Sequence, residues 1–329
     1  MSFTAAVIAG IVPMLIYPVF LYWMDRYEKE PLGLVAATFL WGFIPAALMS
    51  LITQVIIGVP FLMLDATGAL ADAVIAVAVA PVTEEIFKGA ALLMIMLIWR
   101  HEFDGVFDGV IYGSLVGFGF AAIENILYFL DSDGSIVFSR AVLFGLNHAL
   151  YTSLTGIGFG VGRHSTSRLV RWAAPLTGLV FAILVHAVHN TALVLTGDVP
   201  GLICLAIGAD WMGILLVFVV MVAAIRRERR WIIDELREEV ALRTLNADQY
   251  AVVASPLRRF FVRMDALFTH GLSGYRWVGR YHHTLTKLAY KKHAHRRRGD
   301  AGAPLAEIEN LRREAAVASV ELANLHSAS

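Results

Sequence analysis

Carboxylate, imidazole and amide side chains stand inside several long apolar stretches of this chain. In such surroundings an ionisable group is costly, faces the interior of a helix bundle and by default marks a functional site. A carboxylate can act there as a general base, a histidine can hold a water or donate to an oxyanion, and an amide can stabilise negative charge. The residues that fit these roles are Glu84, Glu85, Glu124, His148, His186 and Asn190. Together they suit the hydrolysis of an amide bond by activated water.

A covalent nucleophile is not indicated by the sequence. No Ser-His-Asp order stands out, and the single cysteine, Cys204, excludes an intramolecular disulfide and any CxxC motif. The same Glu and His residues could instead bind a divalent cation. No HExxH segment signals such a site by its spacing. The residues therefore leave open both a divalent metal such as zinc and a mechanism without metal.

The composition indicates that lipid surrounds much of the chain. Hydrophobic residues make up 58% of the 329 positions, charged residues 16%, and the mean hydropathy is +0.66. A soluble globular protein carries about 25% charged residues. Residues 226–329 differ, because they are polar and rich in arginine. We therefore predict a transmembrane domain over residues 1–225 and a basic, helical cytoplasmic tail over residues 226–329.

The apolar stretches predict an all-α, polytopic bundle of transmembrane helices. A span needs about 20 apolar residues, and no Lys or Arg precedes the first stretch, so we interpret it as a retained span and not as a cleaved signal. Pro45 and Pro81 are potential kink points. The seven predicted spans are 4–24, 32–64, 70–99, 109–130, 136–161, 173–196 and 202–225. An eighth element hidden in the long segment 32–64 would change this topology.

Basic residues predict the orientation of the chain in the cell membrane. They occur on every second connection, and the alternate connections at 65–69, 131–135 and 197–201 contain no Lys or Arg. Because cytoplasmic loops carry an excess of Lys and Arg, the N-terminus should lie outside and the tail in the cytoplasm. Arg140 is the exception near an outer boundary, where we expect it to snorkel toward the membrane surface.

The predicted spans place four of the candidate residues at one depth. Glu84 and Glu124 lie about 15 residues from the predicted inner ends of their spans, and His148 and His186 lie about 13 residues away. At a rise of 1.5 Å per residue, all four sit roughly 20 Å from the inner boundary. Glycines crowd the same spans and let membrane helices approach closely. A shared site between four helices is therefore predicted.

Each of these residues also has a structural interpretation. Glu84 and Lys88 are four residues apart on a helix and could form an ion pair that neutralises itself. A histidine in a span often makes a hydrogen bond between helices. His189 lies off the face that His186 and Asn190 share, so we predict a structural role for it. These interpretations do not account for the common depth.

Four segments, in order, resemble motifs of the PrsW-type intramembrane proteases, relatives of the CAAX prenyl protease and bacteriocin-processing superfamily. Residues 80–88, Ala-Pro-Val-Thr-Glu-Glu-Ile-Phe-Lys, resemble the EExxK motif. Residues 117–125 end in a segment similar to FxxxE, and residues 147–152 carry the histidine of the third motif. Residues 186–190, His-Ala-Val-His-Asn, match HxxxN, with a histidine where an aromatic residue is expected. The resemblance covers residues 20–225.

This resemblance implies an activity and a role for each candidate residue. Proteins of this kind cleave membrane-anchored substrates, of which anti-sigma factors are the known type. Glu84 would be the base, Glu85 and Glu124 would support or position water, and His148 would help to bind it. The histidine and asparagine of the HxxxN segment would stabilise the oxyanion. Family members are commonly called metalloproteases, whereas the related prenyl proteases are argued to depend on glutamate, so the resemblance does not decide the metal question.

The tail lies outside the resemblance. Residues 226–245 mix arginines and acids at helical spacing, which predicts a solvated helix that continues the last span. Residues 255–298 interleave basic and aromatic residues, which favours contact with anionic lipid. Nucleic-acid binding is disfavoured, because no recognisable motif is present. Residues 304–325 form a further amphipathic pattern that could serve self-association.

Two other functions compete with the protease hypothesis. The intramembrane Glu and His residues could form the pathway of a proton- or cation-coupled transporter. Alternatively, the chain could be a catalytically silent membrane scaffold. Loss of proteolysis on replacing the carboxylates, with folding intact, would distinguish the protease from both.

Overall fold

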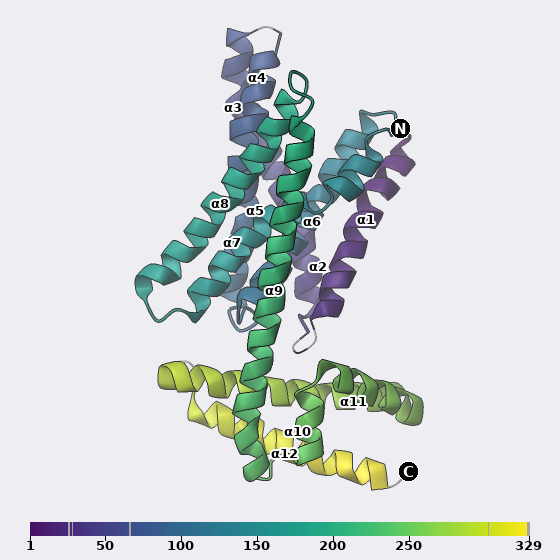
Figure 1. Ribbon diagram of the computed structural model, residues 1–329, viewed down its shortest axis with the longest axis vertical. Helices are drawn as coiled ribbons and strands as arrows, with labels where there is room; N and C mark the ends of the chain where they lie inside the picture. Colours follow the sequence, from purple (N-terminus) through teal and green to yellow (C-terminus); the bar gives the residue numbers. More distant parts are fainter. Residues whose placement is uncertain (26, 28, 66, 302, 328–329) are drawn as a thin grey trace. The chain divides into compact units, whose positions relative to one another are not determined.

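The computed structural model describes every residue except 26, 28, 66, 302 and 328–329 (Figure 1). The described residues form helices and connecting turns, and none of them lies in a strand. The prediction of an all-α protein is therefore confirmed. The chain divides into two compact units, one made of Met1–Met24 with Glu30–Ala224, and the other of Asp25–Lys29 with Ile225–Ser329.

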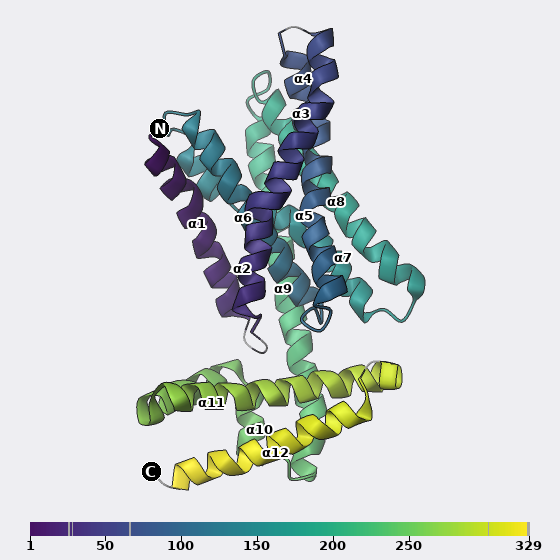
Figure 2. The same ribbon diagram turned by 180° about the vertical axis from the view of Figure 1, so that it is seen from behind.

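The first unit is a bundle of helices (Figures 1 and 2). Three short π-helical segments, Gly42–Ala46, Ile75–Val79 and Ser139–Leu143, interrupt or extend its α-helices. The α-helices are α1 (Phe3–Met24), α2 (Leu32–Trp41), α3 (Ala47–Leu64), α4 (Ala69–Val74), α5 (Ala80–Ile98), α6 (Val106–Leu130), α7 (Asn147–His164), α8 (Arg168–Leu195) and α9 (Leu202–Ala241), of which α9 continues into the second unit.

Several helices are long and apolar enough to cross a membrane, which makes this a multi-pass membrane protein. Five such helices occur among the described residues: Phe3–Met24, Leu32–Leu64, Val106–Leu130, Arg168–Leu195 and Leu202–Ala241. The predicted spans 70–99 and 136–161 are not among them. The first is helical but carries several charged residues. The count of seven spans therefore stays a prediction.

The predicted span 136–161 is not a single helix. A π-helical segment ends at Leu143, a turn follows at residues 144–146, and α7 begins at Asn147. Gly145 lies in this turn, and glycine is among the least favourable residues in a helix interior. As a result, Asn147 and His148 lie in the first turn of α7 and not in the middle of a long helix.

The segment Leu32–Leu64 conceals no hidden turn; all its residues are described and form one continuous helix through α2, Gly42–Ala46 and α3. Pro45 lies inside the π-helical part, and Pro81 follows the π-helical segment Ile75–Val79 by two residues. Proline has no N–H and crowds the preceding turn, so a locally wider turn accommodates it. The two predicted kink points therefore coincide with changes of helix type.

Helix α6 lies at the centre of the bundle. In its most apolar window 89% of the residues are buried, against 11% to 22% in the other candidate spans. Its glycines bring the backbone of α7 very close: a Cβ on Gly109 would lie 2.1 Å from the carbonyl oxygen of Gly156, and one on Gly117 would lie 2.4 Å from that of His148. This close packing holds α7 at a fixed register along α6.

The second unit has its own hydrophobic core. It contains the end of α9, α10 (Ala247–Val253), α11 (Pro256–Arg298), a short 3₁₀ turn and α12 (Leu305–Ser327). Ile232, Leu285 and Leu288 are fully buried in this core. The helical tail was predicted, but the apolar face of α12, assigned to self-association, packs into the core of its own chain at Ile308 and Leu311.

Helix α11 is a hairpin of two helical legs. Gly271 has a φ of 66° and a ψ of −160°, which lies outside the helical region and which glycine adopts readily. On either side of this turn the legs run back along each other, since a Cβ on Gly274 would lie 2.7 Å from the carbonyl oxygen of Ala266. The tail therefore presents two antiparallel helical surfaces within α11.

Replacing Gly117 by alanine should destabilise the bundle. The added methyl group would overlap the α7 backbone, and overpacking of this kind costs about 1–3 kcal/mol of unfolding free energy. Gly33→Ala is the matched control, because a Cβ there meets nothing within 4 Å in the described part of the chain. Thermal unfolding in detergent measures both variants. Equal melting temperatures for Gly117→Ala and Gly33→Ala would contradict the packing described.

Acidification should weaken the tail through His282. Its side chain is buried, and burial beside Arg259 and Arg263 lowers its pKa to about 3. The unfolded chain has a histidine pKa of about 6.5, so it binds a proton first, and stability falls by up to about 1.4 kcal/mol per pH unit from 6.5 down towards 3. Above pH 6.5 this contribution is fully present.

Hydrogen exchange of α11 and α12 amides at neutral and mildly acidic pH measures the effect in the full chain. His282→Leu should remove most of the acid dependence. His270→Leu, at a half-buried position in the same hairpin, should leave that dependence as it is. Identical pH profiles for the wild type and His282→Leu would show that this histidine is not the cause.

Candidate active site

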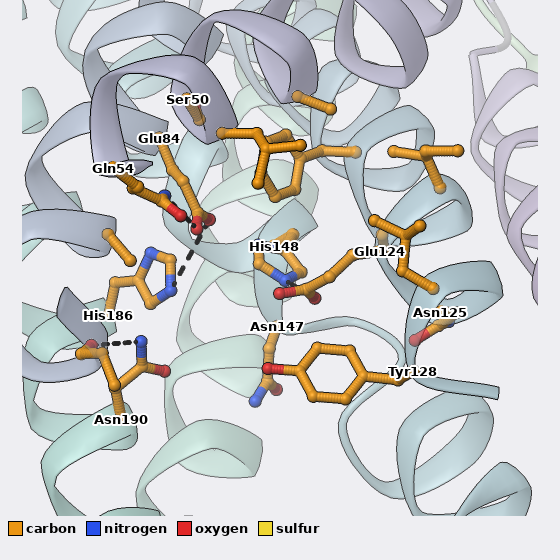
Figure 3. Close-up of a pocket in the computed structure, with 18 of the residues that line it drawn as sticks. Ser50, Gln54, Glu84, Glu124, Asn125, Tyr128, Asn147, His148, His186 and Asn190 are labelled. Carbon is orange, nitrogen blue, oxygen red and sulfur yellow. Dashed lines mark hydrogen bonds and ion pairs between the residues drawn. The ribbon is translucent and has the colours of Figure 1, made fainter. Parts of the chain in front are cut away.

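A cavity of about 790 Å³ opens between the helices of the first unit. Figure 3 shows side chains from α5, α6, α7 and α8 that point into it. The sequence-predicted residues that line it are Glu84, Glu124, His148, His186 and Asn190. Glu85 is absent from this lining and lies behind it. The structure therefore brings together residues from four helices, at separations of up to about a hundred positions in the chain.

Glu84 lines the cavity, and one of its two carboxylate oxygens makes no hydrogen bond to the described residues. It is 6% exposed, and its Oε1 accepts a hydrogen bond from Gln54 Nε2 at 3.3 Å. Its Oε2 has no hydrogen-bond partner among the described residues. His186 Nε2 lies 3.9 Å from that oxygen, an ion pair marked in Figure 3. Lys88 Nζ lies 3.6 Å from the same oxygen. Glu84 thus offers a buried carboxylate oxygen that is close to two nitrogens but bonded to neither.

Glu85, in contrast, is fully engaged. Its side chain is completely buried, and Lys88 Nζ lies 2.6 Å from its Oε1. His186 Nδ1 lies 3.1 Å from the same oxygen, and Thr152 Oγ1 donates to Oε2 at 3.1 Å. An anion so well supplied with donors orients its neighbours and is a poor base. Because Nδ1 of His186 faces Glu85, its Nε2 faces Glu84 and the cavity.

His148 is held on both sides of its ring. Lys88 Nζ lies 3.0 Å from Nδ1, and Glu124 Oε2 lies 2.8 Å from Nε2. An ammonium group only donates, so Nδ1 is the acceptor and Nε2 carries the hydrogen that it donates to Glu124. His148 therefore links the Glu84–Lys88 side of the cavity to Glu124.

Arg140 completes this arrangement and was not recognised as a site residue. Its guanidinium pairs with Glu124 Oε2, donates from Nε to Asn125 Oδ1 at 3.1 Å, and lies 3.7 Å from the centre of the Tyr128 ring. The expectation that Arg140 snorkels did not anticipate this partner. The sequence signal available was a lone arginine at an apolar boundary near Glu124. Glu124 is consequently an anion neutralised by Arg140.

Asn190 lines the cavity beside His186, on the side away from Glu124 and Asn125 (Figure 3). Its Nδ2 donates to the backbone carbonyl of Ala76 at 2.8 Å. Ala76 belongs to the π-helical segment Ile75–Val79. The amide therefore has a fixed orientation, set by the irregular backbone that precedes α5.

A second buried network lies beside the first and was missed by the sequence interpretation. Asp210 of α9 is 2% exposed, and its Oδ2 lies 2.7 Å from His189 Nδ1 and 2.9 Å from Asn147 Nδ2. His189 and Asn147 both line the cavity. The network ties α9 to α7 and α8. A carboxylate inside the predicted span 202–225 was the signal that could have found it, as was Gln54 inside 32–64.

Three of these residues could hold a metal ion. Glu84, His148 and His186 each offer one ligand atom, and these atoms all lie within 4.8 Å of one another. Two imidazoles and one carboxylate form the donor set of many catalytic zinc sites. The unpaired Oε2 of Glu84 and the orientation of His186 by Glu85 also suit a metal. These three residues therefore fit a metal ion. They come from three different helices, so their spacing in the sequence does not indicate a metal site.

The fold and this site define a multi-pass membrane protein with a hydrolytic cluster between its helices, and comparison with known proteins places it in a family. The family described as "PrsW family intramembrane metalloprotease" matches residues 30–225. The chain belongs to this PrsW family and is an intramembrane protease, a hydrolase of peptide bonds. The tail lies outside the match.

Individual relatives agree with this assignment. The chain is 30% identical over 196 residues to Protease PrsW of Geobacillus kaustophilus, covering 56% of this chain and 78% of that protein. It is also 30% identical to Protease PrsW of Bacillus subtilis, over 57% of this chain and 83% of the relative, and 25% identical to that of Clostridioides difficile, over 56% and 78%. No solved structure matches. These relatives give no support to the transporter or scaffold alternatives.

Removing the charge of Asp210 should loosen the bundle next to the site. Asp210→Asn keeps the shape but exchanges charge-assisted hydrogen bonds for neutral ones, at an expected cost of about 1–3 kcal/mol of unfolding free energy. Thermal unfolding in detergent measures this loss. Asp198→Asn, at an exposed position before α9, is the matched control. Equal stability of the two variants would show that the network contributes nothing.

Proposed function

We propose that Glu84 is the general base with which this protease activates water against a peptide bond. The observation that supports the proposal is that Glu84 lines the cavity and that its buried Oε2 has no hydrogen-bond partner among the described residues. Glu85 and Glu124 are occupied by Lys88 and Arg140 respectively. A base needs a lone pair that no hydrogen bond already occupies, so these two carboxylates are better suited to orienting and neutralising their neighbours.

In this mechanism the water oxygen attacks the carbonyl carbon of the substrate while Glu84 takes the proton. The Nε2 side of His186 faces the same region and would donate to the oxyanion, together with the amide of Asn190. Glu84 then passes its proton to the nitrogen of the leaving amine, and the C–N bond breaks. His148 would help to hold the attacking water once one of its ring nitrogens is released from Lys88 or Glu124.

A metal would be held by Glu84, His148 and His186. When bound, a divalent ion such as zinc polarises the scissile carbonyl and acidifies a water. His148 would then have to release Lys88 or Glu124, because both of its ring nitrogens are engaged. Glu85 would keep His186 in the orientation that presents Nε2. Metal-dependent and metal-free versions of the reaction thus use the same residues differently.

The substrate is a protein, and we infer that it is anchored in the membrane, with anti-sigma factors as the leading type. The cavity supports this, because apolar side chains of α3 such as Leu48 and Leu51 line it next to Glu84. We also keep the proposed orientation, with the N-terminus outside and the tail in the cytoplasm. Contact of the basic tail with anionic lipid and self-association through the tail both stay proposals, although Ile308 and Leu311 of α12 already pack into the core of their own chain.

Replacing Glu84 by glutamine should abolish proteolysis without unfolding the protein. General-base catalysis contributes about 10²–10⁴-fold to the rate, so cleavage should fall by at least about a hundredfold. The measurement is cleavage of single-span candidate substrates by the purified protein in detergent. Glu102→Gln, in the loop before α6 and outside the cavity, should cleave at the wild-type rate. Cleavage by Glu84→Gln at the wild-type rate would contradict the proposal that Glu84 is the base.

Elemental analysis of the same preparations decides the role of metal. A bound ion that disappears in His148→Ala and His186→Ala, together with loss of activity on chelation, would establish the metal-dependent version. Full cleavage by wild-type protein that contains no metal would establish the metal-free version. Both versions predict an inactive Glu84→Gln variant, so the metal content of that variant assigns the role of Glu84. An inactive variant that has lost a metal present in the wild type would make Glu84 a ligand and contradict its role as the base.

A further inference from the structure

The first leg of α11, residues 256–270, has two opposite faces. One face packs into the tail, with Ala266 and Arg259 buried at 7% exposure each. Arg259 donates to the hydroxyl of Thr286 on the second leg and to the backbone carbonyl of Tyr27. This face therefore already has its partners within the tail.

The other face carries large apolar side chains that are exposed. Leu257, Phe260, Phe261 and Phe268 are 61%, 48%, 60% and 81% exposed. They follow one another at steps of three, one and seven residues, which places all four on one side of a helix with 3.6 residues per turn. We call these four residues the aromatic stripe. Soluble surfaces rarely gather large apolar side chains in this way, so the stripe indicates a contact.

Basic residues are exposed on the second leg. Arg276, Arg280 and Lys287 are exposed and lie at steps of four and seven residues, again on one side of a helix. We call them the basic stripe. A hairpin with an apolar aromatic surface on one leg and a row of cations on the other has the chemistry of a helix that lies in the interface of an anionic membrane.

The hairpin is joined through α9 to a candidate membrane span. Helix α9 is one of the candidate spans, and it continues without a break from Leu202 to Ala241. Only α10 and two short connections separate its end from Pro256. The tail is therefore tethered to a membrane span, which raises the effective concentration of lipid at the hairpin.

We propose that the first leg of α11 lies in the membrane interface, with the aromatic stripe inserted at the boundary of headgroups and acyl chains and the basic stripe on anionic headgroups. The occupant of the apolar face is the leaflet into which α9 leads. The hairpin would act as a second attachment of the tail, in addition to the covalent one through α9. This inference does not depend on the catalytic mechanism proposed for the cavity.

Site-specific fluorescence in the full chain tests the proposal. Because Cys204 is the single cysteine, Cys204→Ser provides a background into which Phe268→Cys is introduced and labelled with an environment-sensitive dye. The protein is placed as one copy per nanodisc, in equal parts of phosphatidylglycerol and phosphatidylcholine. A blue-shifted emission that nitroxide-labelled lipids quench is the expected result.

The control is Thr269→Cys, the exposed neighbour that lies about 100° around the helix from Phe268 and outside the aromatic stripe. Its label should emit at longer wavelength and be quenched much less. Equal quenching at both positions, or none at either, would overturn the proposal. A blue shift at Phe268→Cys without lipid quenching would also overturn it, since the stripe would then be covered by protein. A blue shift that appears only with two copies per disc would assign the stripe to a second copy of the chain.

Discussion

The structure of the membrane unit depends on the neutralisation of Lys88 at membrane depth. A buried ammonium is stable only when it is paired and its hydrogens are accepted. Glu85 and His148 accept them at 2.6 and 3.0 Å, and the Phe120 ring lies 4.2 Å from the same nitrogen. Lys88 thereby fixes the tautomer of His148, and its ion pair with Glu85 makes that carboxylate a poor base. Glu84, farther from Lys88 at 3.6 Å, keeps one oxygen without a hydrogen bond among the described residues.

The second requirement is close approach of the helix backbones. Glu124 of α6 and His148 of α7 can meet only because the glycines of α6 let the two helices touch. The charges alone would not suffice, since their geometry depends on this register. Arg140 then neutralises Glu124 from the segment before α7, which requires the turn at residues 144–146. Packing and charge pairing therefore support each other, and a defect in one should be felt in the other.

Irregular backbone occurs where the site needs it. The π-helical segment Ile75–Val79 supplies the carbonyl that orients Asn190, and the break before α7 puts His148 in a first turn. Such departures from regular helix are tolerated in a membrane protein where they are buried in protein or line a cavity. The tail also contains an irregular position, Gly271 of α11. The turn at this glycine divides the helix into a hairpin whose two legs have separate outer faces.

The sequence by itself determined the all-α membrane architecture, the family, and five of the polar residues that line the cavity. It could do so because apolar length, charge frequency and the cost of buried charge are properties of residue type and spacing. It did not determine which carboxylate stays free, because Glu84 and Glu85 are neighbours of the same type and differ only in their partners. Arg140, Gln54 and Asp210 were likewise assigned by tertiary contacts between helices distant in sequence. Only the folded structure places these partners, because a side chain's protonation and role depend on what surrounds it.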